Sequence, residues 1–226
     1  MLHDYQTPDD PGGMVQWKPH GGLFGTLAGL VTDPVNVTAT EARMLDKMSI
    51  GDLQAMKDIK SKAFDTADQH FPPPQDKRGN FPAGPDGDAQ FKQWAGNDGH
   101  NDAFRHAYWN ALMTKHFGAD FTARFTQAHE GVPGNKADRE AMDLYNNGVG
   151  RRIAQANPNA SDEQLANLVQ QAVQNGDVVV IDRNGNLAWS DQVRYGEHGV
   201  ANDGPAPGAL PVPQPADPGS SGPGTS

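Results

Sequence analysis

The sequence predicts a mainly α-helical protein: a helical bundle of about five to six helices with a small C-terminal β-hairpin and a disordered tail. Capping-box pairs such as Thr38 with Glu41 mark helix starts, because each side chain satisfies a backbone N–H of the other residue. Apolar residues after these starts recur at the three-to-four spacing of one helix face. β-Branched residues around Asn184-Gly185 indicate the hairpin.

We expect one main domain with long appendages. The length of 226 residues suits a single domain, but 26 glycines and 18 prolines are too many for one compact body. The segments expected are an irregular N-terminal segment at 1–37, a helical domain at 38–200 with its hairpin at 177–190, and a tail at 201–226. The tail holds seven prolines and five glycines, and it cannot bury enough apolar surface to offset the entropy of ordering.

The predicted helices follow one another with clear starts and stops. The first begins at Thr38, and the second runs from Ser49 to about Phe71, where three consecutive prolines end it. Glycine and proline recur at 75–90, which predicts a long loop. The remaining helices are predicted at 102–117, 121–130, 136–156 and 162–175, each followed by glycine or Asn-Pro.

Composition excludes several classes of protein. The net charge of −10 argues against nucleic acid bound through a broad basic surface. Without cysteine, the chain has no disulfide, zinc-thiolate site, iron–sulfur cluster or thiol nucleophile. No run is long and apolar enough for a transmembrane segment, and the glycine-rich run at 21–31 is expected to pack on the domain rather than enter a bilayer. We expect a protein that is cytoplasmic, or secreted by a specialised route without a cleavable signal peptide.

The residues that can carry chemistry gather in a motif core at 97–156. Between Phe91 and Ala156 the chain carries eight basic and seven acidic residues, so this centre is nearly neutral inside acidic flanks. Asp102, His106 and Asn110 are four residues apart and form one polar stripe on a helix. Apolar residues surround the stripe, so burying it is costly unless other polar groups pair with it.

Partners for this stripe are expected on the next two helices. Glu130 follows His129 at the end of one helix, and Asp143 and Asn147 are again four residues apart on the other. Helices packed antiparallel through short loops would bring these groups together.

Two glycines lie within the third of these helices. Gly148 and Gly150 each cost about 1 kcal/mol of helix stability relative to alanine. Close approach of a neighbouring helix is the simplest compensation.

Imidazole and carboxylate groups on facing helices are the ligands from which bundle metal sites are built. We therefore expect a divalent metal, Zn, Mn or Fe, with room for an activated water and a neighbouring general acid or base. The expected metal ligands are Asp102, His106, His129 and Asp143. The expected catalytic residues are His106, Asp102, His129, Glu130, Arg105 and His100, and the expected substrate-binding residues are Asn110, Asn147 and Trp109.

The same residues also admit a structural interpretation. Asp102 and His106 can form a simple helix pair while Arg105 makes a salt bridge to Asp143 or Glu140. Clusters of this kind often fasten helices together without any catalytic role. The protein would then be a non-catalytic structural or interaction module of a secretion particle or a phage particle.

Three sequence blocks resemble an uncharacterised bacterial helical domain that occurs in secreted, effector-like and polymorphic-toxin-like proteins. They are HNDAFRHAYWNAL at 100–112, AHE at 128–130 and MDLYNNGVG at 142–150. The resemblance covers roughly 97–156, and its first motif is the longest and most specific. It implies a context rather than a reaction, with a cognate immunity protein or a secretion-apparatus component as partner. Joined to the polar cluster, it predicts a secreted effector- or toxin-like hydrolase. The functional positions that the resemblance implies in this chain are Asp102, Arg105, His106, His129, Glu130, Asp143 and Asn147.

Overall fold

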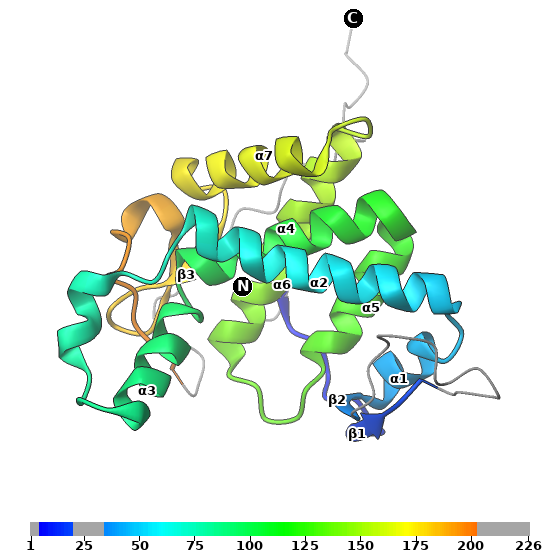
Figure 1. Ribbon diagram of the computed structural model, residues 1–226, viewed down its shortest axis with the longest axis horizontal. Coiled ribbons are helices and arrows are strands. Elements are labelled where there is room, and N and C mark those ends of the chain that lie inside the picture. The colour runs from blue at the N-terminus through cyan, green and yellow to red at the C-terminus, as the bar shows by residue number, and fades with distance from the viewer. Residues whose placement is uncertain (1–4, 20–33, 203–226) are drawn as a thin grey trace, which may run out of the picture.

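The computed structural model describes residues 5–19 and 34–202, which form a mainly helical fold (Figure 1). The predicted fold class is confirmed, with seven α-helices in the described part where five to six were expected. The expectations for residues 21–31 and for the tail from 203 onward lie outside the described residues. Within residues 5–19 and 34–202, no helix is both long enough and apolar enough to span a membrane.

The helix starts follow the predicted caps. Thr38, Ser49 and Ser161 each form a complete capping box at the start of a helix. From the fourth helix onward, the observed starts differ from the predicted ones by at most two residues. The helices are α1 (Ala39–Leu45), α2 (Ile50–His70), α3 (Pro85–Ala95), α4 (His100–Phe117), α5 (Ala119–Glu130), α6 (Ala137–Ala156) and α7 (Asp162–Asn175).

Two segments predicted to be irregular contain regular structure. In the N-terminal segment, β1 (Met14–Trp17) pairs antiparallel with β2 (Val35–Thr38), and Trp17 lies opposite Val35. The predicted loop at 75–90 contains the 3-10 helix η2 (Gln75–Asn80) and the start of α3. Pro85 opens α3 because a proline at the first helical position gives up only an N–H that has no helical partner.

The C-terminal hairpin is confirmed. β3 (Val179–Ile181) pairs antiparallel with β4 (Leu187–Trp189), and Gly185 in the turn has φ +83°, a conformation that favours glycine. The 3-10 helix η3 (Ser190–Gln192) follows. The chain then returns to the bundle, where the backbone N–H of Ala201 donates to Asp98 Oδ2 at 3.2 Å, just before α4.

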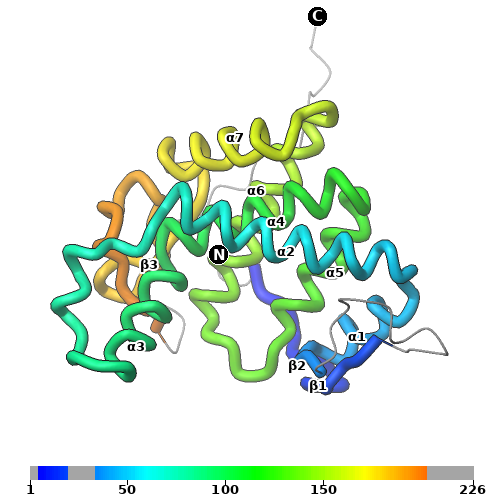
Figure 2. Tube along the Cα trace, viewed as in Figure 1, coloured from blue at the N-terminus to red at the C-terminus, as the bar shows by residue number. Residues whose placement is uncertain are grey.

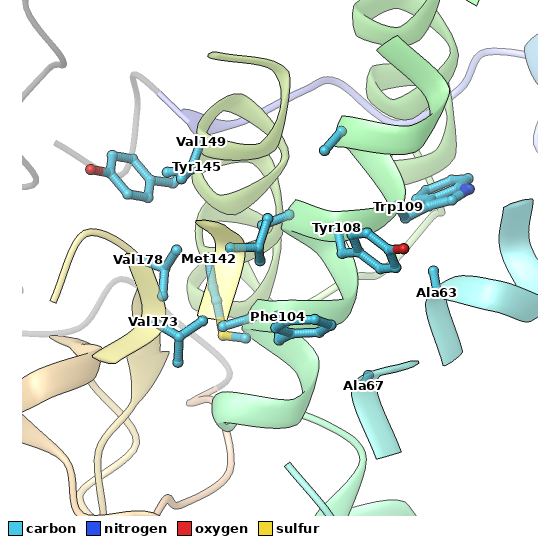
Figure 3. Packing of buried hydrophobic residues seen from close by; sticks show 14 of the residues in the cluster. Ala63, Ala67, Phe104, Tyr108, Trp109, Met142, Tyr145, Val149, Val173 and Val178 are labelled. Carbon is cyan, nitrogen blue, oxygen red and sulfur yellow. The ribbon is translucent and has the colours of Figure 1, made fainter. Parts of the chain in front are cut away.

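Helix α4 is the centre of the bundle. The helices α2, α5, α6 and α7 all pack against it, as the traces in Figures 1 and 2 show. In Figure 3, Phe104 and Tyr108 of α4 lie on the side that faces Ala63 and Ala67 of α2, while Met142 of α6 lies toward the β3 side. All five side chains are buried, so two apolar layers enclose α4.

The closest approach of α4 and α6 depends on Gly150. A Cβ atom on Gly150 would lie 1.9 Å from the backbone oxygen of Ala107, so no other residue fits there. The close approach of a neighbouring helix, which was expected to compensate for the helix stability that glycine loses, is therefore present at Gly150. A Cβ on Gly148 would meet only arginine side-chain ends, of which Arg152 Nη1 is nearest at 3.1 Å. Contact between the helices therefore requires glycine only at position 150.

We expect Gly150→Ala to lower the free energy of unfolding by about 1–3 kcal/mol, because the added methyl group forces α6 away from α4. The matched variant Gly148→Ala should be neutral or stabilising by up to about 1 kcal/mol, because alanine favours the helix. Urea unfolding of both variants measures the difference. Equal effects would show that Gly150 does not set the helix spacing.

Candidate functional site

Polar stripes on two parallel helices face each other in the interior of the bundle. Contacts advance in the same direction along both helices: His106 with Asn147, then Asn110 with Arg151. Helix α5 packs against both and places Glu130 at the same level as Asn147. The stripes are Asp102, His106 and Asn110 on α4, and Asp143, Asn147 and Arg151 on α6.

Three ligand-type atoms converge at one end of these stripes. His106 Nε2 lies 3.5 Å from Asp102 Oδ1 and 3.5 Å from Asp143 Oδ1. The ligand atoms of the three residues all lie within 4.8 Å of one another, and all three residues are buried. Asp143 Oδ1 has no hydrogen-bond partner. A buried carboxylate oxygen without a partner is costly, so Asp143 Oδ1 is an acceptor that still needs a donor or a cation.

The geometry fits a divalent ion. A tetrahedral ion with bonds of about 2.0–2.1 Å holds its ligand atoms about 3.3–3.4 Å apart. The two separations of 3.5 Å around His106 Nε2 are close to this value. One imidazole and two carboxylates suit Zn, Mn or Fe. The structure thus brings together three of the four residues that the sequence predicted as metal ligands.

The fourth predicted ligand, His129, lies elsewhere, and this expectation is corrected. His129 Nδ1 is 2.8 Å from Glu41 Oε1 of α1, and its ring packs edge-on against Trp109. Consecutive residues leave a helix about 100° apart, so His129 and Glu130 cannot face the same neighbour. Only Glu130 faces the site, where its Oε1 lies 3.8 Å from His106 Nδ1.

Two further candidates are held by other parts of the fold. His100 Nε2 donates to the backbone oxygen of Ser190 at 2.9 Å and so fastens the C-terminal segment to the start of α4. Trp109 is buried against Phe125 and lines an apolar cavity of about 190 Å³ together with Trp17. Neither belongs to the group of three converging residues.

Arg105 belongs to the site but pairs differently from the expected salt bridge. Its guanidinium donates to Asp102, and its Nη2 also reaches the backbone oxygen of Gly96 at 3.3 Å. The expected partners were Asp143 and Glu140. The arginine lies three residues after Asp102 on the same helix, so the local pair forms instead.

Burial and charge set the protonation of the site. Burial lowers the pKa of His106 to about 4, so the imidazole is neutral at neutral pH. Burial also raises the pKa of Glu130 to about 7. Burial, with the nearby carboxylates of Glu130 and Asp102, raises the pKa of Asp143 well above its ordinary value. Burial opposes the charge of Asp102, but Arg105, His106 and the hydrogen bonds from Asp98 and Arg105 together outweigh burial and lower the pKa of that carboxyl. Glu130 and Asp143 are therefore buried carboxyl groups of raised pKa beside the ionised Asp102, an environment that favours an added cation.

The sequence analysis missed the outer support of this site. Asp98 accepts two hydrogen bonds from Arg139, at 2.7 and 2.6 Å, and its backbone N–H donates to Asp102 Oδ2 at 2.7 Å. Asp98 has φ 65°, in the left-handed region. Asparagine and aspartate enter this region more readily than other non-glycine residues, so the run Asn97-Asp98-Gly99 was the available signal.

Comparison with known proteins finds one similarity. Residues 86–177 match the family model described as a domain of unknown function, DUF6973. The match spans less than half of the chain, from α3 to α7, and contains Asp102, His106, Glu130 and Asp143. No curated protein and no solved structure matches the chain.

The pair of His129 and Glu41 makes stability depend on pH. Burial opposes both charges, but their hydrogen bond and mutual attraction raise the pKa of His129 and lower that of Glu41. The histidine contribution is complete below its ordinary pKa of 6.5 and is lost as pH rises through the raised value. The glutamate contribution is complete above 4.5 and is lost as pH falls through the lowered value. We therefore expect His129→Asn to destabilise the protein most between pH 4.5 and 6.5.

Urea unfolding of the wild type and His129→Asn at about pH 5.5 and pH 8.5 tests this expectation. The exposed residue His116 supplies the control variant His116→Asn, which should leave the free energy of unfolding nearly unchanged. A His129→Asn effect of the same size at both pH values would contradict the assignment.

Proposed function

We propose that the chain is a metal-assisted hydrolase with Asp102, His106 and Asp143 as its metal ligands. The observation that supports this most is the buried convergence of three ligand atoms from α4 and α6, among them the unpartnered Asp143 Oδ1. A divalent ion binds the neutral form of an imidazole and the ionised form of a carboxyl group. His106 Nε2 and Asp102 Oδ1 lie 3.5 Å apart, close to the separation of two ligand atoms on such an ion.

The chain's own residues have distinct roles in this proposal. A divalent ion at this site would supply a water of lowered pKa and would polarise the bond to be hydrolysed. Glu130 is the candidate general base of the site, since its pKa of about 7 is near the operating range of such a group. Asn147 Nδ2 donates to Glu130 Oε1 at 3.2 Å and holds this carboxyl beside His106. Arg105 holds Asp102 in its ionised form.

The biological context in this proposal is delivery to another cell. The resemblance of residues 100–112 to a domain of effector-like and toxin-like proteins supports it. A secreted hydrolase of this kind would have a cognate immunity protein or a secretion-apparatus component as partner. Experiment must identify the bond that is hydrolysed.

A second candidate, a non-catalytic module, is favoured by the internal pairing of the same groups. Arg105 pairs with Asp102, and Asn147 joins His106, Asn110 and Glu130. Such a network can fasten α4, α5 and α6 without any ligand. This candidate gives no role to the unpartnered oxygen of Asp143, which is why we favour the enzyme.

We expect the full chain to bind one Zn²⁺ or Mn²⁺ and Asp143→Asn to weaken binding by more than about 100-fold. The fold should survive, because the raised pKa of Asp143 already favours an uncharged group at this position. Asp65→Asn, at an exposed position of α2, is the matched control and should bind as the wild type does. Calorimetric titration of the metal-free protein measures all three.

Activity is tested with a panel of phosphate monoesters, phosphate diesters and carboxylic esters. Hydrolysis by the metal-loaded wild type and by Asp65→Asn, with loss in Asp143→Asn, supports the enzyme. Absence of metal binding in the folded wild type would contradict the enzyme and leave the non-catalytic module.

A further inference from the structure

A chain of hydrogen bonds runs from Arg151 to the imidazole of His106. Before His106 its members are Arg151, Asn110 and Asn147, which are not among the proposed ligands. They come from both helices, so the chain crosses the interface of α4 and α6 three times. The links are Arg151 Nη1 to Asn110 Oδ1 at 3.0 Å, Asn110 Nδ2 to Asn147 Oδ1 at 2.6 Å, and Asn147 Oδ1 to His106 Nδ1 at 3.2 Å.

Arginine gives this chain its direction. A guanidinium group has donors and no acceptor, so the atom of Asn110 that faces Arg151 is the carbonyl oxygen. The amide nitrogen of Asn110 then faces the other way, toward Asn147 Oδ1 and the backbone oxygen of His106 at 3.0 Å. Thr126 Oγ1 donates to a backbone oxygen of its own helix and accepts from Arg151 at 3.3 Å, which holds the guanidinium in place.

The other end of the chain agrees with this direction. Asn147 Nδ2 donates to Glu130 Oε1, so the amide oxygen of Asn147 must face His106. An amide oxygen only accepts, and the neutral imidazole therefore carries its proton on Nδ1. His106 Nε2 is left with a lone pair. That lone pair faces Asp102 Oδ1 and Asp143 Oδ1, each at 3.5 Å.

We propose that Arg151 is a positioning residue that fixes His106 in the Nδ1–H tautomer through Asn110 and Asn147. This chain of hydrogen bonds, which we call the Arg151 relay, thereby leaves Nε2 free to bind a metal. This last step rests on the proposed function. A cluster that only fastened helices would be served better by the opposite tautomer, whose Nε2–H could donate to Asp102 or Asp143. The tautomer therefore distinguishes a ligand site from a structural pair. Partners that orient a ligating histidine through its second nitrogen are a general feature of metal sites.

Nuclear magnetic resonance of the metal-free full chain, with 15N-labelled histidine, reads the tautomer directly. The wild type should show His106 protonated on Nδ1. Asn110→Asp replaces the amide donor by a second acceptor oxygen, which reverses the amide of Asn147 and should shift His106 to the Nε2–H form. Arg151→Lys keeps a donor without acceptors and should retain the wild-type tautomer.

Two further variants keep the test decisive if Asn110→Asp does not fold. Arg151→Met removes one of the groups that set the direction, leaving the backbone oxygen of His106 and Glu130, and should give a mixture of tautomers. Arg152→Gln alters the neighbouring arginine, which lies 6.0 Å from the ring centre of Tyr145 and outside the relay, and should leave His106 unchanged. Zn²⁺ affinity should fall about 10–100-fold in Arg151→Met and be restored in Arg151→Lys.

Failure of this proposal is distinguishable from failure of the proposed function. A wild-type His106 protonated on Nε2, or a folded Arg151→Met that keeps the pure Nδ1–H form, would overturn the relay. The expected tautomers without any Zn²⁺ binding would support the relay and contradict the metal-dependent enzyme.

Discussion

Direct backbone contact between α4 and α6 arranges the polar interior of this protein. Gly150 admits the backbone of Ala107 to a distance that no side chain would allow. At that spacing, the polar residues on one helix meet those on the other, away from water. Burying such groups is unfavourable unless each finds a partner, so the contact both creates the polar cluster and dictates its hydrogen bonds.

Most polar groups of the two stripes find partners within the protein, and the buried stripe atom without a hydrogen-bond partner is Asp143 Oδ1. Amides join the middle of the two stripes, Arg105 pairs with Asp102, and Arg139 pairs with Asp98 just before α4. The unpartnered oxygen of Asp143 remains, opposite a neutral imidazole nitrogen and a second carboxylate oxygen. A cation satisfies Asp143 Oδ1 and the lone pair of His106 Nε2 at one point, beside an Asp102 Oδ1 that also accepts from Arg105, and this is the physical basis of the proposed metal centre.

The sequence predicts those features that depend on local chemistry. Spacing of four residues identified the stripe of Asp102, His106 and Asn110, and capping side chains placed the helix starts. The sequence does not show which side of a helix is turned toward its neighbour. It therefore could not show that Glu130 faces the site while His129 faces α1. The pairing of β1 with β2 joins strands of four residues that are far apart in the chain, where no short-range pattern exists. The Arg151 relay required the register of α4 against α6.

Diffraction from crystals soaked in Zn²⁺, recorded at the zinc absorption edge, is the most direct test of this centre. An anomalous peak should lie about 2.0–2.3 Å from Asp102 Oδ1, His106 Nε2 and Asp143 Oδ1. Crystals saturated with zinc that show these side chains well ordered, with no anomalous peak between them, would contradict a metal centre.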